Sequence, residues 1–205
     1  MSLAEIYDQL AATYAAGRHL FDTTPMLEEF FHRLPATGAL LDAGCGAGVP
    51  VSRYFVERGY EVTGVDISPR MLAIAQEQVP GARFLQQDMR EPSFPDGSFV
   101  GVAAVYSVFH LDRHQHQALF QNFARMLQPG GTLLLTLATR EYSGQDELDG
   151  ELEFLGYQLP YSHDRPEVAR DKLRQSGFSL LWERLITTGG ETFYWVIAGK
   201  PVEGR

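Results

Sequence analysis

The sequence predicts an α/β fold: a doubly wound, seven-stranded, mostly parallel sheet with a C-terminal antiparallel hairpin and helices on both faces. Apolar runs of strand length alternate with amphipathic runs of helix length, which is typical of parallel strands joined by helical crossovers. The last two apolar runs are separated only by Thr188-Gly189-Gly190, a link short enough to indicate a hairpin. With 205 residues, 44% hydrophobic and 21% charged, the chain has the size and composition of a single globular domain.

Residues 1–38 precede the first strand, and we expect them to form an N-terminal helical cap. Apolar side chains recur at helical spacing from Leu3 to Tyr14, which predicts a first helix. A second helix is expected to begin near residues 23–24, because Pro25 suits the first turn of a helix.

Residues 39–138 are expected to form the parallel part of the sheet. The predicted strands are 39–43, 61–65, 82–86, 99–105 and 132–138. We expect one helix over 49–58, a second that begins at Pro69 with Ser68 as its N-cap residue, and a third over 112–127.

Residues 139–163 have no clear hydrophobic period. A gap of this length in a compact domain is usually a lid over a ligand site or carries a short helix of its own. Its aromatic side chains either line an apolar pocket or form a small separate core; they are Tyr142, Phe154, Tyr157 and Tyr161. Residues 164–200 then supply a last helix, for which Asp164 and Glu167 form a predicted capping box, and the terminal hairpin.

Composition excludes several functional classes. The formal net charge is -9 and basic residues do not cluster, which argues against nucleic acid as a partner. The single cysteine, Cys45, excludes an internal disulfide framework and a multi-cysteine zinc site. No apolar run reaches the ~18 residues of a membrane span, and the first residues do not resemble a secretory signal. We therefore expect a cytoplasmic protein with no membrane span.

The strongest functional signal follows the first predicted strand. Leu40-Leu41-Asp42-Ala43-Gly44-Cys45-Gly46-Ala47-Gly48 alternates glycine with other residues between a buried strand and a helix. Glycines let the backbone approach a ligand, and a helix N-terminus supplies free N–H donors. Dinucleotide enzymes use the spacing G-x-G-x-x-G, but Val49 stands at the third glycine position here.

Polar residues follow the second and third predicted strands. Asp66 can accept hydrogen bonds from the two hydroxyls of a ribose, although an acid there can also simply initiate a turn. In Gln87-Asp88-Met89, the carboxylate can read the amino edge of adenine and Met89 can pack on the ring; alternatively, Asp88 pairs with Arg90. These strand ends meet at one crevice, where open α/β sheets bind ligands.

Together these motifs resemble the class I S-adenosylmethionine-dependent methyltransferases, in particular the small-molecule type related to the quinone-biosynthesis methyltransferases. The resemblance implies that S-adenosylmethionine is the cofactor and S-adenosylhomocysteine the product. It implies one methyltransferase domain, in which 39–138 binds the cofactor, 139–163 is the substrate lid, and the last strand lies antiparallel between its neighbours. The acceptor would be an O, N or C atom of a small molecule.

The resemblance also implies a set of cofactor-binding residues around the crevice. They are Tyr7, Tyr14, Asp42, Gly44, Cys45, Gly46, Gly48, Asp66, Ile67, Met71, Gln87, Asp88, Met89, Tyr106 and Ser107. Cys45 is interpreted as a small packed residue rather than a nucleophile. Tyr7 and Tyr14 lie seven positions apart on one helix face, where core packing is an equally good interpretation. Val100 departs from the family, whose members commonly have an acid there.

His110 follows the fourth strand and is the candidate catalytic base, because imidazole can take a proton near neutral pH. The alternative is a hydrogen-bonded structural histidine. A metal site with His114 and His116 is not expected, because Asp112 caps the helix after His110 and so breaks the helical spacing.

Two other functions stay open at this point. One is a nicotinamide-dependent Rossmann oxidoreductase, which Val49 and the terminal hairpin disfavour. The other is a protein that binds S-adenosylmethionine without catalysis. Tyr106-Ser107-Val108-Phe109 replaces the Asn/Asp-Pro-Pro-aromatic run of enzymes that methylate nucleobases, which favours a small-molecule acceptor.

Overall fold

The computed structural model describes residues 1–91 and 93–202, and it confirms the predicted α/β fold. Seven strands form one sheet in the order β3-β2-β1-β4-β5-β9-β8. They are β1 (Ala39–Ala43), β2 (Glu61–Asp66), β3 (Arg83–Gln86), β4 (Phe99–Ala104), β5 (Leu127–Leu137), β8 (Ser179–Thr188) and β9 (Glu191–Gly199). The first five are parallel, and β9 lies antiparallel between β5 and β8.

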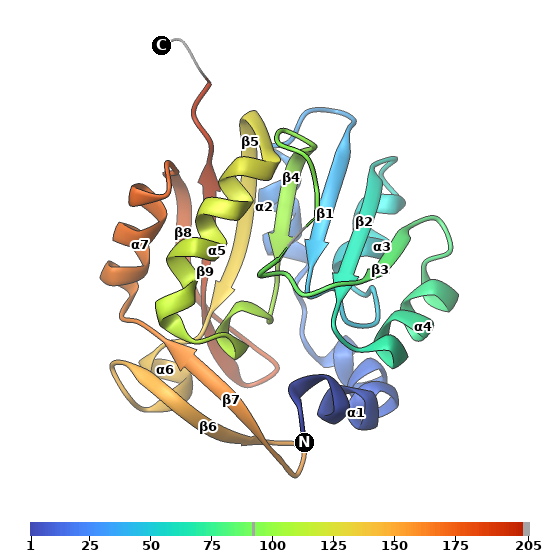
Figure 1. Cartoon of the computed structure of the whole chain (residues 1–205), viewed down its shortest axis with the longest axis vertical. Helices are drawn as coiled ribbons and strands as arrows, with labels where there is room; N and C mark the ends of the chain where they lie inside the picture. The colour runs from blue at the N-terminus through green and yellow to red at the C-terminus, as the bar shows by residue number, and fades with distance from the viewer. Residues whose placement is uncertain (92, 203–205) are drawn as a thin grey trace.

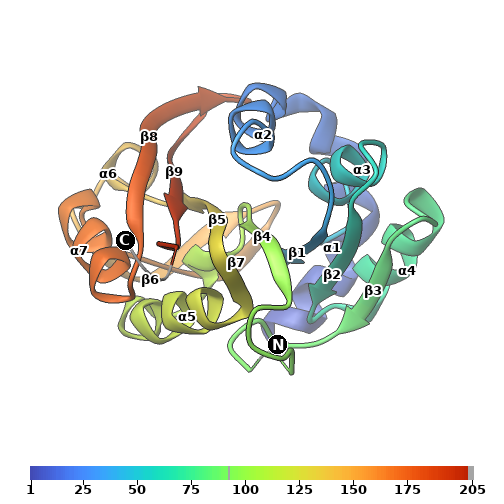
Figure 2. The ribbon, with the colours of Figure 1, turned by 90° about the horizontal axis from the view of Figure 1, so that it is seen from above.

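Helices cover both faces of this sheet, as Figures 1 and 2 show. One face carries α2 (Thr24–Phe31), α3 (Val51–Val56) and α4 (Pro69–Gln78), and the other carries α5 (Arg113–Met126) and α7 (Pro166–Gln175). The neighbours Leu40 and Leu41 in β1 are both buried but belong to different apolar clusters. Strands covered on both faces are apolar at consecutive positions for this reason.

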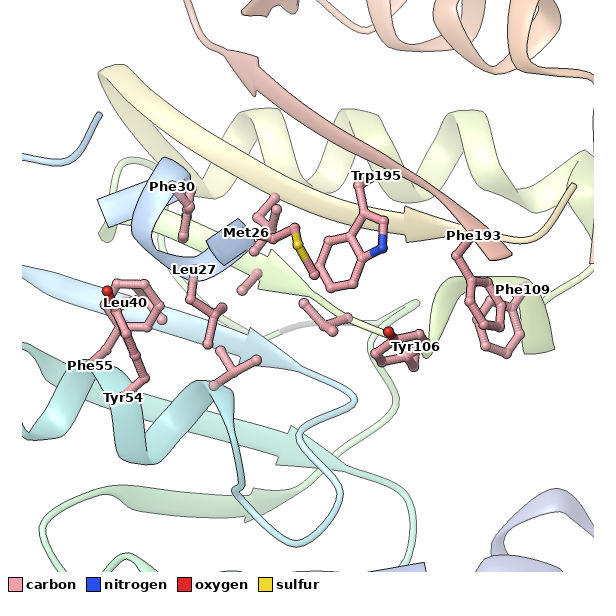
Figure 3. Packing of buried hydrophobic residues seen from close by; sticks show 14 of the residues in the cluster. Met26, Leu27, Phe30, Leu40, Tyr54, Phe55, Tyr106, Phe109, Phe193 and Trp195 are labelled. Atoms are coloured by element: carbon pink, nitrogen blue, oxygen red, sulfur yellow. The ribbon is translucent and has the colours of Figure 1, made fainter. Parts of the chain in front are cut away.

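The core beneath α2 and α3 is rich in aromatic rings (Figure 3). Phe30 of α2 and Phe55 of α3 pack edge to face, with ring centroids 5.6 Å apart, and Trp195 of β9 is fully buried on the same face. Aromatic pairs in this geometry are favourable beyond the area that they bury. This rigid layer holds the strand ends that carry the site.

The carboxyl ends of the parallel strands are covered by two segments from distant parts of the chain (Figure 1). One is α1 (Leu3–Gly17), followed by the short 3-10 helix η1 (Arg18–Leu20). The other is a hairpin of β6 (Leu148–Phe154) and β7 (Tyr157–His163), which forms a second sheet after the short helix α6 (Arg140–Ser143). A further 3-10 helix, η2 (Val108–His110), follows β4 at this edge.

The sequence did not predict the β6–β7 hairpin. Its turn is Leu155-Gly156, where Leu155 has a positive φ of 50°. Two-residue hairpin turns usually signal themselves by Asn-Gly or Asp-Gly, and leucine rarely takes this conformation. Acidic residues do alternate with Leu148, Leu152 and Phe154 along β6, as in a strand with one face toward the protein, but without a recognisable turn this short pattern does not by itself predict one arm of a hairpin.

Three smaller expectations were wrong. The capping box of Asp164 is absent, because α7 begins at Pro166 with Arg165 as its N-cap residue; Asp164 is instead buried against Lys172. The helix expected over 49–58 is shorter, since Pro50 is the N-cap residue of α3. The strand β5 begins five residues earlier than expected, at Leu127. Within 1–91 and 93–202, no helix is long and apolar enough to cross a membrane.

Candidate functional site

A cavity of about 370 Å³ lies at the carboxyl ends of β1, β2 and β4; we call it the first cavity. The structure brings most of the predicted cofactor-binding residues to its wall. These are Tyr7, Tyr14, Gly44, Gly46, Asp66, Ile67, Met71, Gln87, Asp88, Met89, Tyr106 and Ser107. Sequence reasoning missed other lining residues, namely Leu3, Val65, Arg90, Leu111, Asp112, Gln115 and Pro160.

The glycine loop is fixed from the side of β2. The backbone N–H groups of Gly44 and Cys45 both donate to the carbonyl of Val65, at 2.8 and 3.0 Å. Gly44 has φ +74°, and a Cβ there would collide with Ser107. Gly46 has φ +51°, but a Cβ there would meet only the ring of Tyr14, at 3.8 Å. The loop is therefore closed behind Gly44 and leaves free space at Gly46.

Asp66 is anchored at the end of β2 by two backbone groups. Its Oδ2 accepts from the N–H of Gly46 at 2.8 Å, and its Oδ1 accepts from the N–H of Ser68 at 2.9 Å. A carboxylate has about four acceptor positions, so lone pairs remain for a ligand in the first cavity. Burial raises the pKa of Asp66, while these hydrogen bonds oppose the shift.

Asp8 positions the N-terminal helix over the site, a role that sequence reasoning missed. Its Oδ1 accepts from the hydroxyl of Ser68 at 2.6 Å and from the N–H of Arg70 at 3.1 Å. Both donors lie at the N-terminus of α4, where a negative charge is favourable. The bond ties α1 to α4 and sets the neighbouring Tyr7 over the first cavity. The adjacent pair Tyr7-Asp8 was the available signal.

Three predicted cofactor-binding residues do not line the first cavity. Asp42 is buried, and its Oδ2 accepts from the hydroxyl of Ser52 at 2.7 Å; burial raises the pKa of Asp42 to about 7. The thiol of Cys45 is also buried, in agreement with a packing role. A Cβ on Gly48 would press on Phe84 at 3.1 Å. These residues shape the loop from behind.

Asp88 lines the first cavity but is already paired. The guanidinium of Arg90 donates to both carboxylate oxygens, with its Nε 3.0 Å from each. The alternative left open by the sequence, an ion pair with Arg90, is therefore present. Met89 also lines the first cavity, and its terminal methyl group lies close to Gly44.

A second cavity, of about 290 Å³, adjoins the first. Both are lined by Tyr7, Tyr14, Tyr106 and His110, so these four side chains form a shared wall. The second cavity is further lined by Thr13, Gly17, Arg18, Leu20, Phe21, Phe109, Phe154, Leu155, Tyr161, Glu191 and Phe193. Of the aromatic residues predicted in the 139–163 segment, Phe154 and Tyr161 reach it, whereas Tyr142 and Tyr157 do not.

Tyr106 holds its place in the shared wall at a conformational cost. Its φ is +56°, which costs a bulky residue of order 1–3 kcal/mol. Its N–H donates to the hydroxyl of Thr136, and its ring packs edge to face on Phe193 and Trp195 at 5.0 and 5.5 Å. Strain of this kind is concentrated at functional sites. The Tyr106 hydroxyl is buried and has no hydrogen-bond partner among the described residues.

His110 contacts the N-terminal helix and the hairpin at once. Its Nδ1 lies 2.8 Å from the carbonyl oxygen of Pro160, and its Nε2 lies 2.6 Å from the hydroxyl of Tyr7. A carbonyl can only accept, so the proton resides on Nδ1 and Nε2 accepts from Tyr7. Burial lowers the pKa of His110 to about 4. The ring is therefore a neutral acceptor at physiological pH.

The structure does not combine His110 with His116 into a metal site. The Nε2 of His116 lies 3.0 Å from the carbonyl oxygen of Leu111, and His116 is on the buried face of α5. In the part of the chain that the structure describes, no three His, Cys, Asp or Glu side chains converge as a metal site.

Known proteins resemble both the sequence and the fold. Residues 40–131 match the family model described as a methyltransferase domain. The chain is 39% identical over 106 residues to a malonyl-[acyl-carrier protein] O-methyltransferase of Enterobacter lignolyticus, covering 51% of this chain and 41% of that protein. It is 31% identical over 150 residues to the 27-O-demethylrifamycin SV methyltransferase of Amycolatopsis mediterranei, covering 65% and 54%. The matched stretch thus spans about half the length of these relatives.

A solved structure extends the likeness over the whole fold. The 1,6-didemethyltoxoflavin-N1-methyltransferase of Burkholderia thailandensis, with bound 1,6-didemethyltoxoflavin and S-adenosylhomocysteine, has a TM-score of 0.73. The superposition covers 98% of this chain and 92% of that one at 19% identity, so it supports the fold alone. Residues 40–131 are thus similar in sequence to a methyltransferase domain, and the fold is similar to that of a solved methyltransferase structure.

Proposed function

We propose that the protein transfers a methyl group from S-adenosylmethionine to a small molecule. The observation that carries the proposal is the pair of cavities with a shared wall, because methyl transfer needs a cofactor and an acceptor placed end to end. The first cavity takes the cofactor, and the second takes the acceptor. When bound, the sulfonium of S-adenosylmethionine supplies an already activated methyl group.

The residues around the first cavity fit this cofactor. The open backbone at Gly46 accommodates the methionyl part, and the free lone pairs of Asp66 accept from the ribose hydroxyls. Met89 offers an apolar surface to adenine, while Asp88 meets its amino group only with the lone pairs that Arg90 leaves free. Asp42, Cys45 and Gly48 support the loop from behind the cavity wall.

The chain's own residues contribute alignment, exclusion of water and a hydrogen-bond acceptor for the methyl acceptor's O–H or N–H group. Alignment of two reactants alone can contribute roughly 7–11 kcal/mol to catalysis. The helix α1 and the β6–β7 hairpin cover the site, which excludes water from it. The Tyr7 oxygen can accept a hydrogen bond from the O–H or N–H group of the acceptor. Nε2 of His110, whose ring stays neutral, fixes the orientation of the Tyr7 hydroxyl. His110 thus acts through Tyr7 as a positioning residue.

The relatives support a methyltransferase over the other candidates. Both sequence relatives carry methyltransferase names, whereas Val49 and the β8–β9 hairpin are unlike a nicotinamide-dependent oxidoreductase. A protein that binds S-adenosylmethionine without catalysis would differ from the proposed enzyme only in the absence of turnover, so a turnover measurement separates the two. A cytoplasmic location and the exclusion of nucleic acid as a partner stay predictions.

Ligand-dependent thermal unfolding tests the proposal, since a ligand that binds only the native state raises its midpoint. We expect S-adenosylmethionine and S-adenosylhomocysteine to raise the unfolding temperature, and NAD and NADP to leave it unchanged. Stabilisation by the nicotinamides alone would overturn the proposal. Transfer of label from methyl-labelled S-adenosylmethionine to a panel of small acceptors then separates the enzyme from a non-catalytic binding protein.

A further inference from the structure

We propose that the second cavity binds a neutral, planar aromatic compound whose O–H or N–H group donates a hydrogen bond to the hydroxyl oxygen of Tyr7. This inference rests on the proposed function in one respect: it makes that compound the methyl acceptor. The binding itself is argued from the cavity wall.

The wall of the second cavity is built largely from aromatic rings of several distant segments. Phe109 stacks nearly parallel on Tyr161, with centroids 5.0 Å apart and planes 7° apart. It also stacks on Phe193 at 5.4 Å and 20°, and Figure 3 shows these two rings beside Tyr106. These rings stack on one another and together line the second cavity. An aromatic lining favours an aromatic ligand over a saturated one, because rings gain from offset and edge-to-face contacts.

The hydrogen-bond pattern of the shared wall defines the polar group of the ligand. The Pro160 carbonyl keeps the His110 proton on Nδ1, so the Tyr7 proton is directed at Nε2. The Tyr7 oxygen is then left with acceptor lone pairs only. A ligand group that meets this oxygen must bring a proton, because an ether or ketone oxygen would place lone pairs against lone pairs.

The charges around the second cavity favour a neutral ligand. Arg18 and Glu191 both line it, and the guanidinium of Arg18 lies 4.3 Å from the centroid of the Tyr106 ring. Burial raises the pKa of Glu191, and the positive charge of Arg18 opposes that shift. Because one cation and one anion offset each other here, neither an anionic nor a cationic ligand gains a net attraction.

Calorimetric titration of the full chain with four naphthalene-based probes tests the inference. The probes are 1-naphthol, 1-naphthylamine, 1-methoxynaphthalene and decahydro-1-naphthol. We expect 1-naphthol or 1-naphthylamine to bind at least tenfold more tightly than 1-methoxynaphthalene, which lacks the donor, and than decahydro-1-naphthol, which lacks the aromatic rings. Whichever of the first two binds more tightly identifies the donor as O–H or N–H. Equal affinity for all four overturns the inference.

Two matched variants test whether Tyr7 accepts the hydrogen bond of the ligand. In Tyr7→Phe, the preference for 1-naphthol over 1-methoxynaphthalene should fall to within twofold. In Tyr157→Phe it should be unchanged, because the Tyr157 hydroxyl donates to Gln9 outside the cavity. A preference that survives in Tyr7→Phe contradicts the inference. If Tyr7→Phe does not fold, the relative affinities of the four probes for the unaltered chain still test the inference.

A parallel titration with S-adenosylhomocysteine separates this inference from the proposed function. Binding of S-adenosylhomocysteine without selectivity among the probes would overturn the aromatic donor site and leave the methyltransferase proposal standing. Selectivity among the probes without binding of S-adenosylhomocysteine would overturn the methyltransferase proposal instead.

Discussion

The hydroxyl of Tyr7 lies 2.6 Å from Nε2 of His110, although the two residues are 103 positions apart in the chain. Their rings also meet edge to face, with centroids 5.4 Å apart. The contact joins α1 to the segment after β4 and fixes two members of the shared wall of the two cavities, Tyr7 and His110, against each other. It explains why the N-terminal helix belongs to the site rather than to the periphery.

Substitution of Asp66 should weaken binding of the adenosyl ligand. Asp66→Ala removes an anchored carboxylate from the first cavity, and a lost hydrogen bond to a charged group is worth about 1.5–3 kcal/mol. Calorimetry should therefore show S-adenosylhomocysteine affinity lowered by roughly 10- to 100-fold. The control is Asp171→Ala, which removes an exposed carboxylate that pairs with Arg174. Unchanged affinity in Asp66→Ala would remove Asp66 from the proposed site.

Gly44→Ala should lower the free energy of unfolding by more than an ordinary glycine substitution does. Both Gly44 and Gly177 have strongly positive φ, at +74° and +89°, but only at Gly44 would a Cβ meet other atoms. The left-handed backbone alone costs an alanine about 1–2 kcal/mol. We expect Gly44→Ala to lower the free energy of unfolding by clearly more than Gly177→Ala, and only Gly44→Ala to weaken S-adenosylhomocysteine binding. Equal effects would show that the loop has room behind Gly44.

Acid should destabilise the protein in part through His116. Burial lowers the pKa of His116 from 6.5 to about 4, so the unfolded chain takes up a proton between these values and the folded chain does not. Stability therefore falls as the pH drops below about 6.5, by about 2 kcal/mol at pH 5. In urea unfolding at pH 7.5 and 5, His116→Gln should lose less stability than the unaltered chain. The exposed His32→Gln should behave like the unaltered chain; an identical loss in His116→Gln would refute the assignment.

Breaking the ion pair beneath the hairpin should destabilise the fold. Asp164 is buried, and it accepts from Lys172 and, at 3.3 Å, from Arg113. Asp164→Ala leaves the largely buried ammonium of Lys172 without its carboxylate, which typically costs about 3–5 kcal/mol. Chemical denaturation should show this loss. The double variant Asp164→Ala with Lys172→Met should recover part of it, and no recovery would mean that Asp164 acts through other contacts.

Local patterns in the sequence were enough to predict the sheet and much of the first cavity. The alternation of apolar runs gave the strands, and Gly44, Gly46 and Asp66 lie where a strand-loop-helix pattern places them. Each of these inferences depends on residues close together in the chain. The parallel topology then brings the strand ends to one edge.

The remaining features depend on contacts between distant segments. The bond between Tyr7 and His110 leaves no spacing pattern in the sequence, and the pair Tyr7-Asp8 does not by itself show that Asp8 binds α4. The hairpin was missed because Leu155 takes a conformation that leucine rarely adopts. Asp164 was misread as a cap, because a buried acid and an N-cap acid look alike until the position of Lys172 is known.

A crystal structure with S-adenosylhomocysteine would show whether the first cavity holds the adenosyl ligand. We expect density for the ligand in the first cavity, with its ribose hydroxyls on Asp66 and its sulfur facing the wall formed by Tyr7 and Tyr106. An empty first cavity at saturating ligand, or a ligand bound elsewhere on the chain, would contradict it.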